Sequence, residues 1–251
     1  MDAFSSVGDG ILYNTPSYPP FLDLPLHAKR RSVEWPLIKS ETGWHYNMES
    51  LEEILEADRG IRILLLCNPH NPTGVVLKQS ELSQIVNLCH KYNITLVSDE
   101  IHSDFIYKES IHIPTLTIDG ADSVTIALTS GAKSFALAGM RCAVAIPGND
   151  ILKEKLLEVP KFLLGGANRM GCEATIAAWE TGSAWMDELI QTLDDRRLHL
   201  KSRLDEEIPE AKMFLPDSTF LAWIDLSEFN PGEKPATWLR EKTGVACGNG
   251  P

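Results

Sequence analysis

The chain has 251 residues, of which 43% are hydrophobic and 23% are charged, a composition typical of a globular protein with one large domain or somewhat more. Its formal net charge of -12 at pH 7 argues against nucleic acids and anionic membrane surfaces as partners, because both are bound through clusters of Lys and Arg. A small-molecule ligand in a local pocket is compatible with these numbers.

Short apolar strands alternate with amphipathic helices in the first half of the chain. Residues 11–13 follow a Gly-Asp-Gly turn and are predicted to form a strand, and residues 47–55 are predicted to form a helix. Residues 61–67 are an almost continuous apolar run, which is typical of a strand buried on both faces. Apolar side chains recur at helical spacing over residues 81–89, and residues 94–98 return to strand composition. This order predicts an α/β fold with a mainly parallel sheet and helices on both faces.

The pattern continues beyond residue 120. Residues 124–129 and 142–146 are predicted strands, separated by a Gly-rich stretch. Long helices are predicted from Cys172 to the neighbourhood of Ile208. We therefore assign residues 1–185 to a large domain built on the sheet.

The end of the chain has a different pattern. Residues 213–226 alternate apolar and polar side chains, as in an antiparallel strand pair, and residues 236–242 are predicted to be helical. We assign residues 186–251 to part of a smaller α+β C-terminal domain.

The cysteines and the first residues bear on the cellular environment. The five cysteines form no CxxC or Cys/His spacing, so we expect reduced thiols and no metal site. No apolar run is long enough to span a bilayer, and the opening MDAFSSVGDG lacks the basic and apolar regions of a signal peptide. A cytoplasmic protein is the expectation.

Polar residues follow the predicted strands, where ligands bind in sheets of this kind. The loop NPHNPTG, residues 68–74, is predicted to be non-helical because of its two Asn-Pro pairs and its glycine, which leaves Asn71 free to donate a hydrogen bond. A plain turn is the alternative. Asp99 follows the strand 94–98, where a carboxylate needs a cationic or hydrogen-bonded partner such as a protonated pyridine nitrogen. Helix capping is the alternative for Asp99.

A third group of polar residues lies between the strands 124–129 and 142–146. Lys133 stands among small residues with few acidic neighbours, a setting in which a lysine loses its proton more easily and attacks an aldehyde carbon. Ser130 and Arg141 offer a hydroxyl and a planar charged fork suited to a phosphate dianion. Each alone is compatible with a solvated surface residue, but the set favours a site.

The order NPHNPTG, SDEIH and a lysine followed eight positions later by arginine resembles the class I/II aminotransferases of pyridoxal-phosphate fold type I. Within that group, PSYPPF, CNPHNPTG, SDEIHSD and FLAWIDLSEF are most similar to the MalY/PatB branch of carbon-sulfur lyases, which includes cystathionine beta-lyases. The resemblance covers essentially the whole chain, and it implies pyridoxal 5'-phosphate as cofactor.

The resemblance implies a role for each matching residue. Lys133 would carry the cofactor as a Schiff base and move the substrate's α proton. Asp99 would keep the pyridine nitrogen protonated, and Asn71 would bond the phenolic oxygen. His102 stands where many relatives carry a tyrosine that reaches the same oxygen, and a packed neutral histidine is the alternative. Tyr18 would stack on the pyridine ring, with core packing as its alternative.

The phosphate group would be bound by Ser130 and Arg141. Relatives often carry serine directly before the lysine, and Ala132 stands there in this chain, which removes one phosphate hydroxyl. Two further parts of the family pattern have no counterpart: an upstream Gly-rich helix start that binds phosphate, and a downstream arginine that grips the substrate's carboxylate. We therefore expect a truncated chain with weakened cofactor retention and poor or absent turnover.

Three functions are compatible with the resemblance. The first is a β-lyase that acts on cystathionine or cysteine-type amino acids and gives a thiol, pyruvate and ammonia. The second is an aminotransferase that passes the amino group to a 2-oxo acid, and the third is an inactive relative that binds a protein partner. The branch similarity favours the lyase. The family also implies a homodimer and a small amino-acid substrate.

Overall fold

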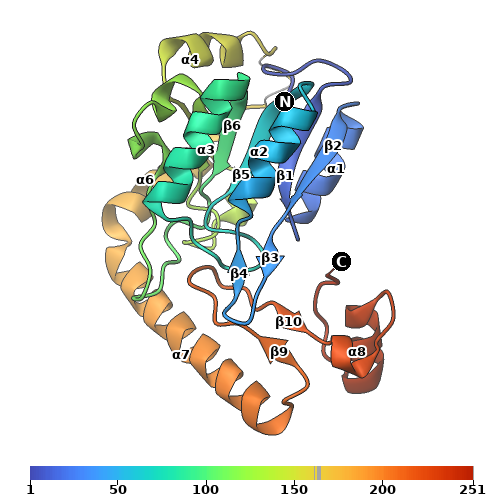
Figure 1. The fold of residues 1–251 in the computed structure, drawn as a ribbon. Helices are drawn as coiled ribbons and strands as arrows, with labels where there is room; N and C mark the ends of the chain where they lie inside the picture. The colour runs from blue at the N-terminus through green and yellow to red at the C-terminus, as the bar shows by residue number, and fades with distance from the viewer. Residues whose placement is uncertain (161, 163–164, 251) are drawn as a thin grey trace.

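The computed structural model describes residues 1–160, 162 and 165–250. Its centre is a six-stranded sheet with the strand order β2-β1-β5-β6-β7-β8 (Figure 1). The strands of this sheet are β1 (Gly10–Thr15), β2 (Arg31–Pro36), β5 (Ile61–Cys67), β6 (Thr95–Asp99), β7 (Thr125–Thr129) and β8 (Val144–Pro147). All neighbouring strands are parallel except β7 and β8, which run antiparallel. The predicted mainly parallel α/β sheet is confirmed.

Helices connect the strands and extend the chain beyond the sheet. They are α1 (Pro19–His27), α2 (Met48–Ala57), α3 (Gln79–Tyr92), α4 (Asp150–Leu157), α6 (Arg169–Thr181), α7 (Ser183–Glu207) and α8 (Pro235–Thr243). Short 3-10 helices occupy Thr115–Thr117, Ala121–Ser123, Ala138–Met140 and Ser227–Phe229. Helices α2 and α3 lie side by side over one face of the sheet (Figure 1).

Burial on both faces explains the continuous apolar run of β5. Leu64 and Leu66 of β5 pack with the buried side chains of α2 and α3 on one face. Ile63 and Leu65 belong to a second cluster on the opposite face, which includes Phe21 of α1. Successive residues of a strand point to opposite faces, so a strand covered on both sides has no polar face to show in its sequence.

The chain leaves the sheet through α7 and enters a smaller C-terminal part (Figure 1). There β9 (Lys212–Met213) and β10 (Ile224–Asp225) form an antiparallel pair, followed by α8. A second hairpin, β3 (Ile38–Lys39) with β4 (Trp44–His45), is joined to this part by an ion pair between Lys39 and Asp225. The predicted domain boundary between residues 185 and 186 falls in the first turn of α7, and the division into domains stays a prediction.

The tail differs from its sequence pattern in one respect. Residues 213–226 do contain the predicted antiparallel pair, but each strand is only two residues long. The residues between the two strands form an irregular segment that hydrogen-bonds to loops of the large sheet. Residues 216–220 of this segment reach the candidate site, as described below.

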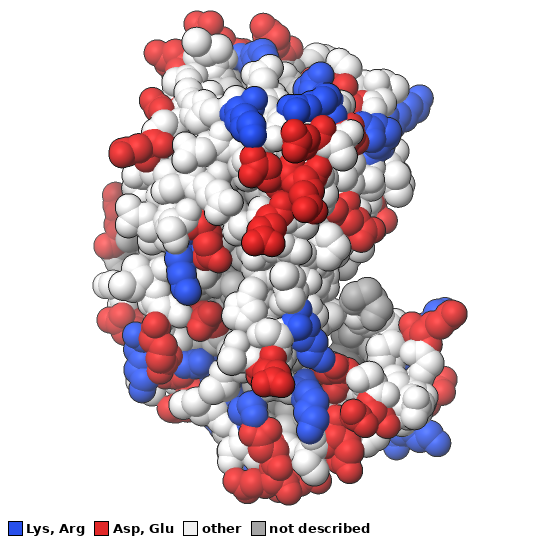
Figure 2. Space-filling model, in the orientation of Figure 1, with Lys and Arg blue, Asp and Glu red and all other residues white. Residues whose placement is uncertain are grey.

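Charged side chains are interspersed over the visible face of the molecule. Figure 2 shows acidic clusters with basic side chains between them, as the net charge of -12 leads one to expect. None of the helices in the described part of the chain combines the length and the hydropathy needed to cross a membrane.

Candidate active site

One edge of the sheet gathers all seven side chains that the sequence analysis singled out. The carboxyl ends of β1, β5, β6 and β7 lie at this edge because these strands are parallel. The antiparallel strand β8 starts at the same edge, since Val144 pairs with Thr129 at the end of β7. Residues that follow the four parallel strands or precede β8 therefore lie along this one edge: Tyr18 after β1, Asn71 after β5, Asp99 and His102 at and after β6, Ser130 and Lys133 after β7, and Arg141 before β8.

The loop after β5 contains two asparagines, and they differ in whether the side chain forms hydrogen bonds within the described chain. Asn68 is fully buried, donates its backbone N–H to the Asp99 carbonyl at 3.0 Å and accepts the Leu77 N–H on its side-chain oxygen at 3.0 Å. Asn71 is partly buried, and its side chain makes no hydrogen bond to any described residue. Asn68 thus shapes the loop, while Asn71 is available to a ligand.

Two adjacent carboxylates lie at the end of β6, and they differ in how many hydrogen bonds the described residues provide. Glu100 is buried and accepts hydrogen bonds from Ser98 Oγ at 3.0 Å and from the Thr115 N–H at 2.9 Å. His112 Nε2 lies 3.2 Å from its other oxygen. Burial acts to raise the pKa of Glu100, but the hydrogen bonds from His112 and Thr115 outweigh it and the pKa is lowered. Glu100 is therefore a structural carboxylate.

Asp99 has fewer partners than its neighbour. Its Oδ1 accepts the Ile101 N–H at 3.1 Å, and it forms no ion pair within 4.0 Å of a described residue. Burial raises the pKa of Asp99, while the Ile101 N–H and the positive charge of Lys133 act in the opposite direction. A partly buried carboxylate in this state gains from a cationic nitrogen that a ligand brings.

His102 lies deep in the same cluster. It is 2% exposed, and its ring contacts the rings of Phe220 and Phe105 at centroid distances of 5.4 and 6.0 Å. Its Nδ1 has no hydrogen-bond partner among the described residues. Burial lowers the pKa of His102 to about 4, and the charge of Lys133 contributes to the shift. The imidazole is therefore neutral at pH 7, and its Nδ1 is unused within the described part of the chain.

The sequence analysis did not single out His70, which extends this cluster. His70 is 1% exposed, and its Nδ1 lies 2.7 Å from Thr73 Oγ1. Burial lowers the pKa of His70 to about 3, and His102 adds to the shift. The position of His70 inside NPHNPTG is the only sequence signal for it, and that signal did not reveal its burial.

The loop after β7 holds Lys133 between fixed neighbours. Ser130 is 3% exposed, donates its hydroxyl to the Cys142 carbonyl at 2.6 Å and accepts the Ala132 N–H at 3.0 Å. Its proton is therefore used within the loop, and a phosphate would have to draw the hydroxyl away from Cys142. The predicted phosphate role of Ser130 stays a prediction.

Arg141 and Tyr18 are the exposed members of the set. Arg141 has a positive φ of 49° and forms no ion pair among the described residues. Tyr18 is 38% exposed directly before α1, and its ring meets Phe21 edge-on at 6.1 Å. Both side chains are accessible to a ligand, and their roles in binding stay predictions.

Residues 216–220 complete the site from the far end of the chain. Ser218 Oγ donates to the Gly74 carbonyl at 2.8 Å, and the Thr219 N–H donates to the Phe105 carbonyl at 2.9 Å. Thr219 is fully buried with φ of 69°, a conformation that a β-branched residue rarely adopts. The turn places the ring of Phe220 against His102, so this segment joins the loops after β5 and β6.

Arg197 of α7 anchors the same segment. It donates to the Pro216 carbonyl at 3.0 Å and to Glu109 at 2.7 Å, and its guanidinium lies 4.0 Å from the centre of the Tyr107 ring. The Tyr107 hydroxyl donates to the Thr219 carbonyl at 2.7 Å. Arg197 and Pro216 are 19 residues apart in the sequence, the other contacts join positions 88 or more residues apart, and no local pattern predicts them.

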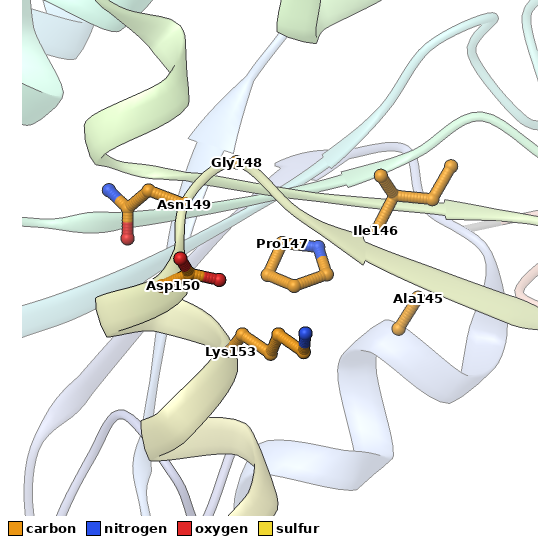
Figure 3. Close-up of a pocket in the computed structure, with 7 residues that line it drawn as sticks. All are labelled: Ala145, Ile146, Pro147, Gly148, Asn149, Asp150 and Lys153. Atoms are coloured by element: carbon orange, nitrogen blue, oxygen red, sulfur yellow. The ribbon is translucent and has the colours of Figure 1, made fainter.

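A surface hollow lies beside β8, away from the candidate site residues. It is lined by residues 145–150 and Lys153, where β8 meets α4 (Figure 3). The hollow is at the end of β8, whereas Arg141 precedes its start, so it is at the opposite edge of the sheet. None of the seven candidate site residues lines it.

The chemistry of the donor set fits pyridoxal phosphate, the cofactor that the sequence resemblance implies. An amine (Lys133) and a carboxylate without an ion-pair partner in the described chain (Asp99) are close enough for the charge of one to shift the pKa of the other. The orphaned Nδ1 of His102 and the available amide of Asn71 can bond a phenolic oxygen. The residues present therefore fit the group.

Comparison with known proteins supports the resemblance to pyridoxal-phosphate enzymes. A sequence profile described as aminotransferase class I and II matches residues 2–250. Cystathionine beta-lyase PatB of Bacillus subtilis is 33% identical over 233 residues, which cover 91% of this chain and 59% of that protein. Protein MalY of Escherichia coli is 33% identical over 229 residues, which cover 90% of this chain and 58% of that protein.

The fold comparison agrees with the sequence comparison. A crystal structure of the PLP-bound C-S lyase from Staphylococcus hominis superimposes with a TM-score of 0.91 at 29% identity, covering 98% of this chain and 64% of that one. The chain thus spans 58–64% of the length of these three relatives. The resemblance drawn from NPHNPTG, SDEIH and the lysine loop is confirmed: the chain belongs to the class I and II aminotransferase family.

Proposed function

We propose that this chain binds pyridoxal 5'-phosphate and contributes the catalytic core of a carbon-sulfur β-lyase. Its substrates are water and cystathionine or cysteine-type amino acids, and its products are a thiol, pyruvate and ammonia, with one water consumed for each amino acid. The observation that carries the proposal is the convergence of Lys133, Asp99 and His102 at one sheet edge, where the charge of Lys133 shifts the pKa of both other groups. Similarity to two proteins of the MalY/PatB branch and to a PLP-bound C-S lyase supports the choice of reaction.

Each residue has a separate task in this proposal. Lys133 would hold the cofactor covalently, and its amine, once the substrate's amino group has replaced it on the cofactor, would remove the α proton of the substrate. Asp99 holds a proton on the pyridine nitrogen, which requires the carboxylate to be charged when the cofactor is bound. Asn71 and the neutral His102 orient the cofactor through its phenolic oxygen. When bound, the cofactor supplies an electron sink for the pair left on the α carbon.

The remaining candidate residues hold the ends of the cofactor. Arg141 pairs with the phosphate, assisted by Ser130 once its hydroxyl turns from Cys142. Tyr18 lies over the face of the pyridine ring, which keeps the conjugated system aligned.

An aminotransferase is the second candidate, since the family that matches the chain is described by that activity. The two reactions share the removal of the α proton by Lys133 and differ in the next step. A lyase expels a thiolate from the β carbon, whereas an aminotransferase returns the proton to the cofactor. An assay with cystathionine separates them, because only the lyase releases thiol and pyruvate together.

The binding experiment comes first. Purified protein is mixed with pyridoxal phosphate, its visible absorbance is recorded, and the adduct is reduced with borohydride and located by peptide mapping. We expect a yellow adduct on Lys133 that is absent in Lys133→Ala and retained in Lys108→Ala, which removes an exposed lysine. A folded protein without this adduct would contradict the proposal and favour a binding protein.

Two further proposals concern the setting of the enzyme. We propose a homodimer, on the basis of the family resemblance, and a cytoplasmic location, which the scattered free cysteines support. Sedimentation of the purified chain tests the first, and cell fractionation tests the second.

A further inference from the structure

The residue after Lys133 is held on two sides by parts of the chain outside the lysine loop. Ser134 is fully buried, and its hydroxyl donates to the carboxylate of Asp104, which lies two residues after His102. Its backbone carbonyl accepts the indole N–H of Trp185 at 3.0 Å. The indole is half-exposed, yet its one polar atom is bonded to the backbone carbonyl of the residue that follows the reactive lysine.

The start of α7 also packs against this loop. A Cβ at Gly182, directly before α7, would overlap the ring of Phe135, so the helix can approach only because the residue is glycine. On the other side of the lysine, the Ala132 N–H is held by Ser130 Oγ at 3.0 Å. The residues on either side of Lys133, Ala132 and Ser134, are thus each held by hydrogen bonds.

The Lys133 amine has no such anchor of its own. It forms no ion pair with any described residue, although its charge reaches Asp99 and His102. The direction of the side chain is therefore set by the backbone from which it starts. A small rotation of the Ser134 peptide displaces the amine at the end of the long side chain, and reaction geometry is sensitive to displacements of this kind.

We propose that Trp185 and Asp104 are positioning residues for Lys133: together they hold Ser134, one through its carbonyl and the other through its hydroxyl, and so direct the amine toward Asp99 and His102. The inference rests on the proposed function, in which the amine nitrogen bonds to the aldehyde carbon of pyridoxal phosphate with loss of water. Because Trp185 belongs to α7, the lysine loop is fixed by the helix that leads to the C-terminal part of the chain.

A matched pair of variants tests this role. Trp185→Phe removes the N–H and keeps a large ring. Trp179→Phe is the control: Trp179 lies on α6, is similarly exposed, has its Nε1 near Gly131 of the same loop, and donates no hydrogen bond to a described residue. Asp104→Ala and Asp104→Asn form a second pair, because asparagine still accepts from the Ser134 hydroxyl.

Two spectroscopic readouts distinguish positioning from packing. We expect Trp185→Phe and Asp104→Ala to raise the apparent dissociation constant for pyridoxal phosphate roughly 3- to 10-fold, the value of one hydrogen bond. The pH midpoint of the adduct absorbance should move by roughly 0.5 unit for the same reason. Trp179→Phe should match the parent chain, and Asp104→Asn should recover most of the loss seen in Asp104→Ala.

Equal affinities and equal midpoints for Trp185→Phe and Trp179→Phe would overturn the inference, as would an Asp104→Asn variant no better than Asp104→Ala. If the parent chain forms no adduct on Lys133, the proposed function fails and hydrogen exchange decides the inference separately. The Phe135 and Ala136 amides, bonded to the Gly131 and Lys133 carbonyls, should then exchange faster in Trp185→Phe than in Trp179→Phe. Equal exchange rates in the two variants would reject the inference.

Discussion

Replacing Gly74 by alanine tests how tightly the C-terminal segment is packed against the loop after β5. Gly74 ends the NPHNPTG loop, is buried and has φ of 76°, where side chains are strained. A Cβ at this position would overlap Pro216 Cβ and lie 2.9 Å from the Ser218 carbonyl oxygen. The substitution therefore meets two separate obstacles, the backbone conformation and the neighbouring segment.

The two contributions can be estimated one at a time. The left-handed conformation costs a non-glycine residue roughly 1–2 kcal/mol. Overlap with well-packed backbone adds roughly 1–3 kcal/mol, because Pro216 and Ser218 are fixed by Arg197 and by the Gly74 carbonyl. We expect Gly74→Ala to lower the free energy of unfolding by about 2–5 kcal/mol.

Urea unfolding followed by circular dichroism measures this loss, and Gly8→Ala is the control. Gly8 has φ of 89° but no heavy atom within 4 Å of its potential Cβ, so only the conformational cost of roughly 1–2 kcal/mol applies to it. Pro216→Gly in the Gly74→Ala background should recover part of the difference. Equal losses for Gly74→Ala and Gly8→Ala would refute the close approach of the two segments.

Three other predictions follow from the same cluster. His70 and His102 have lowered pKa values, so the stability they contribute is complete above pH 6.5 and is lost as the pH falls toward 3 for His70 and toward 4 for His102. At pH 5 each should reduce the free energy of unfolding by about 2 kcal/mol relative to its value above pH 6.5, which urea unfolding at the two pH values measures. Phe220→Ala should hydrate His102 and raise its pKa, which a proton NMR titration would detect, and an unchanged pKa would show that the ring contributes nothing to its burial. Glu100→Gln should destabilise the fold by about 1–3 kcal/mol. Asp99→Asn should leave stability nearly unchanged and abolish cofactor binding. A larger loss of unfolding free energy for Asp99→Asn than for Glu100→Gln would contradict the assignment of the two carboxylates.

The parts of the fold that were predictable are those with a strong local pattern. The strand at residues 61–67 was predicted with its observed bounds because its apolar run is bounded by Gly60 and Asn68. The helix at residues 47–55 matches α2, whose cap is the side chain of Asn47 accepting the Ser50 N–H. Each of these signals is contained in ten or fewer residues.

The elements that were not predicted lack such a signal. Helix α1 begins with Pro19 and Pro20 and contains Pro25, a composition that normally indicates a loop. The edge strand β2 mixes charged and apolar residues, and its pairing with β1 depends on the rest of the sheet. Tertiary contacts therefore determine the secondary structure of these two segments, against their local sequence preference.

The candidate site was predictable as far as strand ends determine it. Asp99, Asn71 and Lys133 follow parallel strands, and the parallel arrangement alone brings them to one edge. The partners that shape the site, Trp185 and Phe220, come from α7 and the tail, and their contacts depend on how distant segments pack. Sequence periodicity carries no information about such contacts.

His70 and His102 are both neutral at pH 7, and two physical effects keep them so. Burial removes water from His70 and His102, and the charge of Lys133 makes a second positive charge beside it more costly still. A protonated His102 would repel the Lys133 amine. Acid therefore acts on the fold and on the site through the same imidazole, so we expect cofactor affinity and stability to decline over one pH range, from 6.5 toward 4.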